Sequence, residues 1–425
     1  MSSLVTQPSR IDTPVPDPGA APDRRGANLA VLVAALGYFV DIYDLLLFSI
    51  LRVKSLGDLG VTGADELLRV GARLINMQMT GLLIGGILWG VLADKLGRRS
   101  VLFGSIVLYS LANIVNAMVQ TVDQYAWLRL IAGIGLAGEL GAGITLVAEA
   151  MSRHGRGYGT TIVASLGLLG AVVAGFVGQL FHWRTAFVVG GVMGLTLLAL
   201  RIGVRESAMF TATRNATVSR GNFFALFSNR SRVLRYLSVI LLGLPLWYVM
   251  GILVTFSPEV GRSIGLPAPP NPAHAVGFAY FGATVGDLMS GFLSQALRSR
   301  KRALILWLTL CALGVAQYFI LGRLSLTAFN LACFVLGAAS GYWAVLMTVA
   351  SEQFGTNLRA TATSTVPNFI RGAVVPLTTV FQALKPGLGV QGSAIAVGAG
   401  TLLIAYLALT GIEETYAKNL DYLEA

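Results

Sequence analysis

Two aspartates three residues apart occupy the middle of a long apolar stretch, GYFVDIYDLLLF. This spacing places Asp41 and Asp44 on one face of a helix, with Tyr43 beside them. Two carboxylates close together at low dielectric constant cannot both ionise cheaply, so we expect one of them to keep a proton near neutral pH. The pattern indicates a proton-coupling or substrate-contacting site. The alternative is a structural pair bonded to neighbouring helices.

A second apolar run carries both Arg129 and Glu139. A charge at the centre of a bilayer costs about 3 kcal/mol on insertion scales, so each is a functional candidate. The two lie about 15 Å apart along a helix and cannot pair with each other. We expect Glu139 to be a second proton carrier, and Arg129 to neutralise an acid on another helix, such as Asp41 or Asp44, more readily than to bind a ligand directly.

A second intramembrane cation, Arg371, lies in the sequence PNFIRGAVVP. A guanidinium there can hold a carboxylate with two hydrogen bonds, or it can pair with an acid such as Asp287. Asp287 can equally attract a cationic substrate, so the sign of the substrate charge stays open. Four aromatic residues either line the same pocket or serve packing alone: Trp247, Tyr248, Tyr342 and Trp343.

These residues sit in a chain of 425 residues that is 55% hydrophobic and only 12% charged. Soluble proteins carry about 25% charged residues, so the composition indicates a membrane protein. Since a span needs about 20 apolar residues, we predict twelve transmembrane helices, near 28–50, 74–94, 100–120, 125–149, 157–180, 185–204, 236–257, 274–296, 302–321, 327–351, 360–383 and 392–411. The net charge of +11 does not indicate nucleic-acid binding, because the basic residues gather between the spans.

The distribution of Lys and Arg places both termini in the cytoplasm. The first outer loop breaks this trend with four basic residues: Arg52, Lys54, Arg69 and Arg73. We predict five segments: a disordered cytoplasmic tail (1–27), a six-helix bundle (28–204), a cytoplasmic linker (205–235), a second six-helix bundle (236–411) and a cytoplasmic tail (412–425).

The two predicted bundles repeat each other. Gly81, Gly85 and Gly90 recur as Gly282, Gly286 and Gly291, at a constant offset of 201, and Glu149 and Arg156 recur as Glu352 and Arg359, at an offset of 203. Two repeated halves can rock against each other around a site at mid-membrane, which gives alternating access.

A charged cluster, GVLADKLGRR, fills the turn between the second and third runs. It resembles the signature loop of the major facilitator superfamily. The segment Arg129-x-x-x-Gly133-x-Gly135 is similar to the helix 4 motif of that family. Other patterns resemble its sugar-porter and metabolite:proton symporter branches, namely Gly138-Glu139, Trp183-Arg184…Glu206-Ser207 and Glu414-Thr415…Glu424. The resemblance implies an all-α membrane fold of two pseudo-symmetric six-helix bundles, and an Arg at the place of Arg371 that resembles one in organic-anion carriers.

Charged residues at the predicted cytoplasmic ends suggest a gate that joins the halves in one state and opens in the other. The first layer is Asp94, Arg98 and Arg99, and the second is Glu149, Arg156, Glu352 and Arg359. The alternatives are a topology anchor for the first layer and ordinary solvated helix ends for the second.

We therefore expect a secondary transporter of the inner membrane, not an enzyme, that carries a small organic ion, favouring a carboxylate, together with protons. Its expected partners are this substrate, protons and the lipid bilayer; we expect a monomer with no cofactor, metal or nucleic acid. The competing hypothesis is a proton-driven exporter of drugs, lipids or organic cations.

Overall fold

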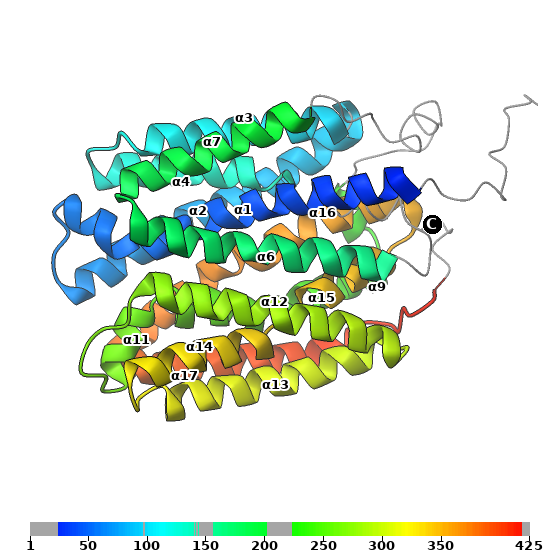
Figure 1. Ribbon diagram of the computed structural model, residues 1–425. Coiled ribbons are helices and arrows are strands. Elements are labelled where there is room, and N and C mark those ends of the chain that lie inside the picture. The colour runs from blue at the N-terminus through cyan, green and yellow to red at the C-terminus, as the bar shows by residue number, and fades with distance from the viewer. Residues whose placement is uncertain are drawn as a thin grey trace, which may run out of the picture.

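A computed structural model describes residues 24–96, 98–139, 141, 143, 156–201 and 223–418. The described elements are all helical. The N-terminal half consists of α1 (Arg24–Asp58), α2 (Ala64–Leu96), α3 (Arg98–Asn116), α4 (Val122–Leu136), α6 (Arg156–Leu180) and α7 (Trp183–Arg201). In Figure 1 these helices run side by side, with α3, α4 and α7 on one flank.

The C-terminal half contains more breaks. Its elements are η1 (Phe223–Phe227), α9 (Arg230–Leu242), α10 (Leu244–Tyr248), the π-helical turn η2 (Val249–Val254), α11 (Ser257–Ser263), α12 (Pro272–Ala296), α13 (Arg300–Leu321), α14 (Leu326–Ala339), α15 (Trp343–Glu352), α16 (Thr356–Gly372), α17 (Val374–Ala408) and η3 (Leu409–Gly411). Helices α13, α14 and α17 form the opposite flank of the bundle (Figure 1).

Nine described segments are long and apolar enough to cross a membrane, and Ser100–Asn116 is a shorter apolar helix. One of the nine, Thr361–Gly411, contains the last two predicted spans, because α17 turns back at Gly389. That glycine has a φ of 66°, a left-handed conformation that suits a residue without Cβ. The described helices thus agree with the predicted series of spans.

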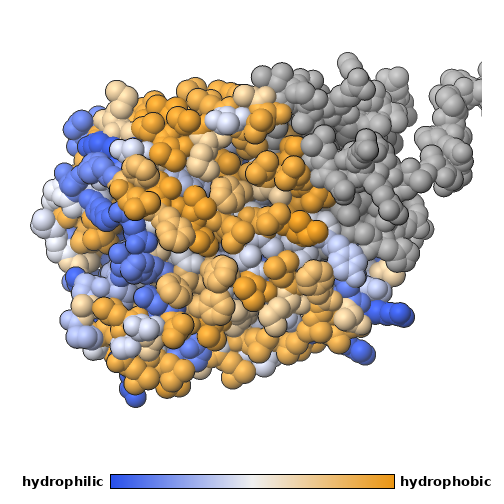
Figure 2. Space-filling model, viewed as in Figure 1, coloured by the Kyte–Doolittle hydropathy of each residue, from blue (hydrophilic) through white to orange (hydrophobic). Residues whose placement is uncertain are grey.

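The outer surface of the helices is strongly apolar. Figure 2 shows a broad hydrophobic band, with hydrophilic side chains gathered at the end of the bundle that carries the α1–α2 loop. Large exposed side chains such as Phe176, Leu180 and Leu313 contribute to this apolar surface. A contiguous apolar belt of this kind matches the lipid core of a membrane.

The repeated glycines allow close helix packing in both halves. A Cβ at Gly85 would overlap the backbone of α4, and a Cβ at Gly286 would overlap the backbone of α14. The third glycine of each set, Gly90 or Gly291, instead lies nearest a threonine of the other half. The internal repeat seen in the sequence therefore corresponds to equivalent packing positions.

Three predicted spans are broken near their middles. The seventh is divided after Gly243, where Pro245 lacks the N–H that a continuous helix uses. The tenth is divided between α14 and α15 at Ser340–Tyr342, and the eleventh between α16 and α17 at Ala373. Breaks inside membrane helices leave backbone groups that other side chains must satisfy.

The first two spans are longer than the sequence predicted. Helices α1 and α2 continue past the apolar runs and leave only residues 59–63 between them, so most of the predicted first outer loop is helical. Helix α1 begins at Arg24, inside the segment predicted as a tail, and the rest of that segment lies outside the described residues. The last part of the predicted linker is ordered as η1 and the start of α9.

Candidate functional site

An ion pair at the middle of the molecule joins the two halves. Arg371 of α16 donates from Nη2 to Oδ2 of Asp41 in α1 at 3.0 Å, and neither side chain is exposed. The sequence analysis considered Asp287 as a possible partner of Arg371, but Arg371 pairs with Asp41 instead. Removing one partner of a buried ion pair costs about 3–5 kcal/mol, because the other charge is left uncompensated.

Arg371 has hydrogen-bonding capacity beyond this pair. Its guanidinium carbon lies 5.9 Å from the ring centroid of Tyr38 and 5.9 Å from that of Trp343. Its Nε and Nη1 are buried without a hydrogen-bond partner among the described residues, as is Oδ1 of Asp41. A buried guanidinium with unused donors is suited to bind a second carboxylate.

The other aspartate of α1 belongs to a separate polar group inside the N-terminal half. Asp44 is fully buried, and a Cβ at Gly190 of α7 would collide with its carboxylate. Arg129 is close enough to attract Asp44 electrostatically, but it donates from Nη2 to Oδ1 of Asn113 at 2.8 Å. The guanidinium of Arg129 also lies 4.7 Å from the ring centroid of Phe187. The two aspartates therefore have different surroundings.

Glu139 lies just beyond the end of α4. It is only 2% exposed, and it is close enough to Asp41 for electrostatic repulsion between the two carboxylates. Asp44 also interacts electrostatically with Asp41, so the three acids that the sequence predicted for proton coupling lie near one another, and Asp41 is the one that pairs with Arg371.

Asp287 of α12 contacts the break in the tenth span. Its Oδ1 accepts a hydrogen bond from the backbone N–H of Ala344, the second residue of α15, at 2.8 Å. Asp287 is fully buried, and no ion pair is present at its carboxylate within the described part of the chain. It therefore caps the start of a half-helix from a neighbouring helix.

The aromatic candidates divide into two groups. Three tyrosines bond backbone oxygens of their own halves: Tyr43 to Ala186, Tyr248 to Ala394 and Tyr342 to Leu242. The indole Nε1 atoms of Trp247 and Trp343 are buried without a partner among the described residues. Within this set of aromatic candidates, Trp343 is the residue whose ring lies beside the guanidinium of Arg371.

The predicted gate lies largely beyond what the structure describes. Glu149 is outside the described residues, and so are the side chains of Asp94, Arg98, Arg99, Arg156 and Arg359. Glu352 is described, and its carboxylate pairs with Arg300 at 3.3 Å. Both residues belong to the C-terminal half, so this contact does not join the halves as the sequence analysis expected.

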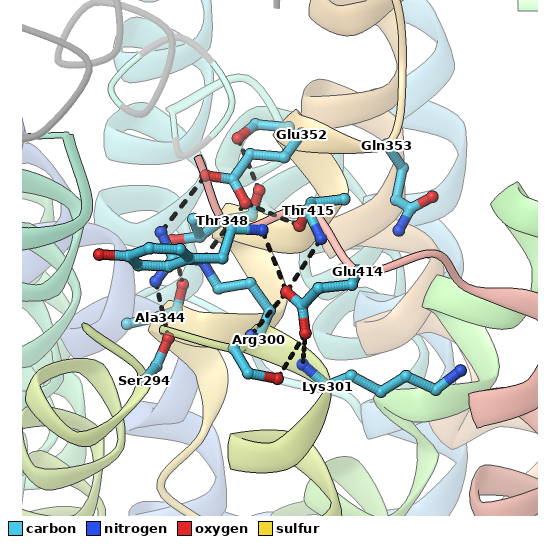
Figure 3. Close-up of polar contacts among 12 residues, drawn as sticks. Ser294, Arg300, Lys301, Ala344, Thr348, Glu352, Gln353, Glu414 and Thr415 are labelled. Carbon is cyan, nitrogen blue, oxygen red and sulfur yellow. Dashed lines mark hydrogen bonds and ion pairs between the residues drawn. The ribbon is translucent and has the colours of Figure 1, made fainter. Parts of the chain in front are cut away.

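The segment after η3 packs against this pair. Figure 3 shows Glu414 beside the start of α13 and Thr415 beside Glu352. Glu414 accepts hydrogen bonds from the Ser299 hydroxyl at 2.5 Å and from the Arg300 backbone N–H at 2.9 Å, and the Thr415 hydroxyl donates to Glu352 at 2.8 Å. Partial burial acts to raise the pKa of Glu414, but these and neighbouring hydrogen bonds outweigh it, so the pKa is lowered below its ordinary value.

A second ion pair joins the two halves, and the sequence analysis did not predict it. Arg52 of α1 donates from Nη2 to Oε2 of Glu259 in α11 at 2.7 Å, with side chains 0% and 7% exposed. Arg52 also donates to the Leu67 carbonyl and lies 4.9 Å from the ring centroid of Phe256. The departure from the positive-inside pattern in the first outer loop was the available signal, since a paired arginine need not follow that rule.

No group of three or more His, Cys, Asp or Glu side chains that could hold a metal ion occurs among the described residues. The candidate site consists of ionisable and aromatic side chains. They lie around the Asp41–Arg371 pair, which joins the two halves, and beside the α14–α15 break.

Comparison with known proteins agrees with this architecture. The Major Facilitator Superfamily model matches residues 29–379. The 3-(3-hydroxy-phenyl)propionate transporter of Escherichia coli is 31% identical over 79% of this chain and 83% of its own length. The gallate transporter of Pseudomonas putida is 28% identical over 74% of this chain and 77% of its own length.

A solved structure shows the same fold. The proton:xylose symporter XylE superposes with a TM-score of 0.71 over 93% of this chain and 98% of its own, at 19% identity. The family match, these relatives and the apolar helical bundle lead to one conclusion: the chain belongs to the major facilitator superfamily and is a multi-pass membrane transport protein, not an enzyme.

Proposed function

We propose that this protein carries a small organic carboxylate across the inner membrane together with protons, as a monomer without a bound cofactor and with both termini in the cytoplasm. The names of its relatives support a carboxylate, since they include transporters of 3-(3-hydroxy-phenyl)propionate, gallate and benzoate. The observation that carries the proposal is the buried Asp41–Arg371 pair, which spans the two halves.

The pair provides a binding position for a carboxylate of the substrate. Arg371 already holds one carboxylate, and its Nε and Nη1 donors have no described partner. A substrate carboxylate can therefore bind beside Asp41 through these donors, and it can then replace Asp41 as the countercharge of the guanidinium. A neutral or cationic substrate would not compensate Arg371 in this way.

Replacement of Asp41 explains why transport would need a proton. Asp41 released as a bare carboxylate would be a buried and uncompensated charge, at a cost of about 3–5 kcal/mol, equivalent to roughly a hundredfold to several thousandfold in affinity. Protonation of Asp41 removes that cost. Proton binding and substrate binding therefore favour each other, and the coupling is reciprocal.

Glu139 and Asp44 lie close enough to Asp41 to pass a proton to or from it. Glu139 is close to Asp41, and Asp44 lies one helical turn further along α1, near Arg129. We assign Glu139 and Asp44 to proton transfer and Arg129 to a supporting role. The charged residues of the α2–α3 turn and their second layer remain our candidates for the cytoplasmic gate.

Uptake by the purified protein in liposomes tests the proposal. A panel of labelled organic acids should accumulate under an inward proton gradient. Asp41→Asn should abolish accumulation while exchange of substrate across the membrane continues, and Arg371→Lys should weaken binding because a lysine lacks the planar fork. Asp123→Asn, which changes an exposed acid, is the matched control and should behave as wild type.

Two results would overturn this assignment. Uptake of organic acids that ignores the proton gradient would remove the coupling, and no uptake of any acid in the panel would remove the substrate class. Export of organic cations driven by the opposite gradient would instead support the exporter hypothesis.

A further inference from the structure

The break in the tenth span is held by a carboxylate that uses only one of its two oxygens. Asp287 Oδ1 accepts from the Ala344 N–H at 2.8 Å, whereas Oδ2 is buried with no hydrogen-bond partner among the described residues. The side chain as a whole is 0% exposed. A buried acceptor without a donor is costly, so an occupant that donates a hydrogen bond would be favoured there.

The position of the break is set by close backbone packing. Gly341 lies between α14 and α15, and a Cβ at this position would come within 2.6 Å of the backbone of Gly286 and Asp287. The residue before α15, Tyr342, makes no capping hydrogen bond with its own side chain. Asp287 is therefore the group that satisfies the start of α15, and it does so beside the backbone contact that fixes the break.

The break is also close to the proposed carboxylate site. Trp343, the first residue of α15, precedes the residue that bonds Asp287, and its ring centroid lies 5.9 Å from the guanidinium carbon of Arg371. Tyr38 of α1 interacts electrostatically with Arg371, Asp41 and Asp287. Arg371 and Asp287, whose Oδ2 has no described partner, thus lie near the same two aromatic residues, Tyr38 and Trp343.

We propose that Asp287 is a specificity-determining residue whose Oδ2 accepts a hydrogen bond from a hydroxyl group of the substrate while Arg371 binds the substrate carboxylate. The inference rests on the proposed function and narrows the substrate class to hydroxylated carboxylates. A hydroxyl is the group that the geometry favours, because Oδ1 already accepts from the backbone N–H of Ala344 and Oδ2 still lacks a hydrogen-bond donor.

Ligand binding to the full-length protein in detergent provides the test, with three probes: 3-(3-hydroxyphenyl)propionate, its 3-methoxy analogue and unsubstituted phenylpropionate. The wild type should bind the hydroxy probe about 10-fold more tightly than the methoxy probe, because the methoxy group cannot donate a hydrogen bond to Oδ2. Asp287→Asn retains an oxygen for the Ala344 N–H and places an amide donor at the Oδ2 position. This variant should lose that preference and gain affinity for the methoxy probe.

The control is Asp123→Asn, which changes an exposed acid away from the site and should leave the ratio of hydroxy to methoxy affinity unchanged. Equal wild-type affinity for the three probes, or an unchanged ratio in Asp287→Asn, overturns the assignment of Asp287. If Asp287→Asn does not fold, the wild-type ratio alone decides. If no acid binds at all, the proposed function itself fails.

Discussion

The two ends of the molecule use buried ion pairs in different ways. At the α1–α2 end, Arg52 and Glu259 connect the N-terminal half to the C-terminal half. At the opposite end, Arg300 and Glu352 connect α13 to α15 inside one half, and the segment around Glu414 covers them (Figure 3). A pair between halves must break when the halves move apart, whereas a pair inside one half can persist.

We expect this difference to separate contacts that control motion of the halves from contacts that hold one half together. A buried ion pair adds little net stability compared with a well-packed apolar contact, because desolvation offsets the attraction. It is therefore suited to a contact that forms and breaks repeatedly once water can reach both charges. The extensive hydrogen bonding around Arg300 and Glu414 is suited to a region that moves as one body.

The largest effect is expected from breaking the pair between halves. Glu259→Ala leaves the Arg52 charge buried without its acid, which should weaken the contact between the halves at the α1–α2 end by about 3–5 kcal/mol. Reaction of a cysteine introduced by Ser49→Cys with a thiol reagent should become faster, because Ser49 lies in the same cross-half contact through Thr255. The native Cys311 and Cys333 are buried and should react slowly.

The exposed pair between Asp65 and Lys385 is the matched control for this end. It also joins the two halves, at 2.7 Å, but Asp65 is 90% exposed. Asp65→Ala should leave the labelling rate unchanged, because exposed pairs are screened by solvent. Slow labelling in Glu259→Ala would show that the Arg52 pair does not hold this end closed.

Within the C-terminal half, we expect a smaller effect, on stability and not on the labelling rate. Glu352→Ala removes two hydrogen bonds from Arg300 and one from Thr415, and should lower stability by about 2–3 kcal/mol. The melting temperature should fall, but the labelling rate of Ser49→Cys should not rise. Glu413→Ala, which removes an exposed pair with Lys418 from the same segment, is the control. Faster labelling in Glu352→Ala would mean that this pair also acts between halves.

The smallest effect concerns Glu414 and depends on pH. The pKa of Glu414 is lowered in the folded protein, so its stabilisation is complete above the ordinary glutamate pKa of about 4.3 and is lost as pH falls through the folded pKa. Glu414→Gln should therefore lower stability by about 1 kcal/mol near neutral pH, the usual size of a helix-capping contribution. Melting temperatures of both proteins should converge in acid; a constant difference at all pH values would contradict the charge-dependent cap.

Much of the architecture was predictable because hydropathy and glycine spacing are local properties. The apolar runs predicted the spans, and the glycines repeated at an offset of 201 predicted matched packing in two halves. The helix ends were less predictable. Residues 52–73 look like a loop by charge alone, but Arg52 can continue a buried helix because Glu259 compensates it.

The sequence by itself predicted six ionisable residues inside the membrane, because each interrupts an apolar run, although it did not single out the buried Arg52 and Glu259. It did not decide their partners. Asp41 pairs with Arg371, 330 residues away, and Asp287 bonds the backbone of a broken helix, because the rotation and depth of packed helices determine which side chains meet. Pairing between helices is a property of tertiary packing, so only the folded structure could separate the Asp41 ion pair from the Asp44 network three residues later.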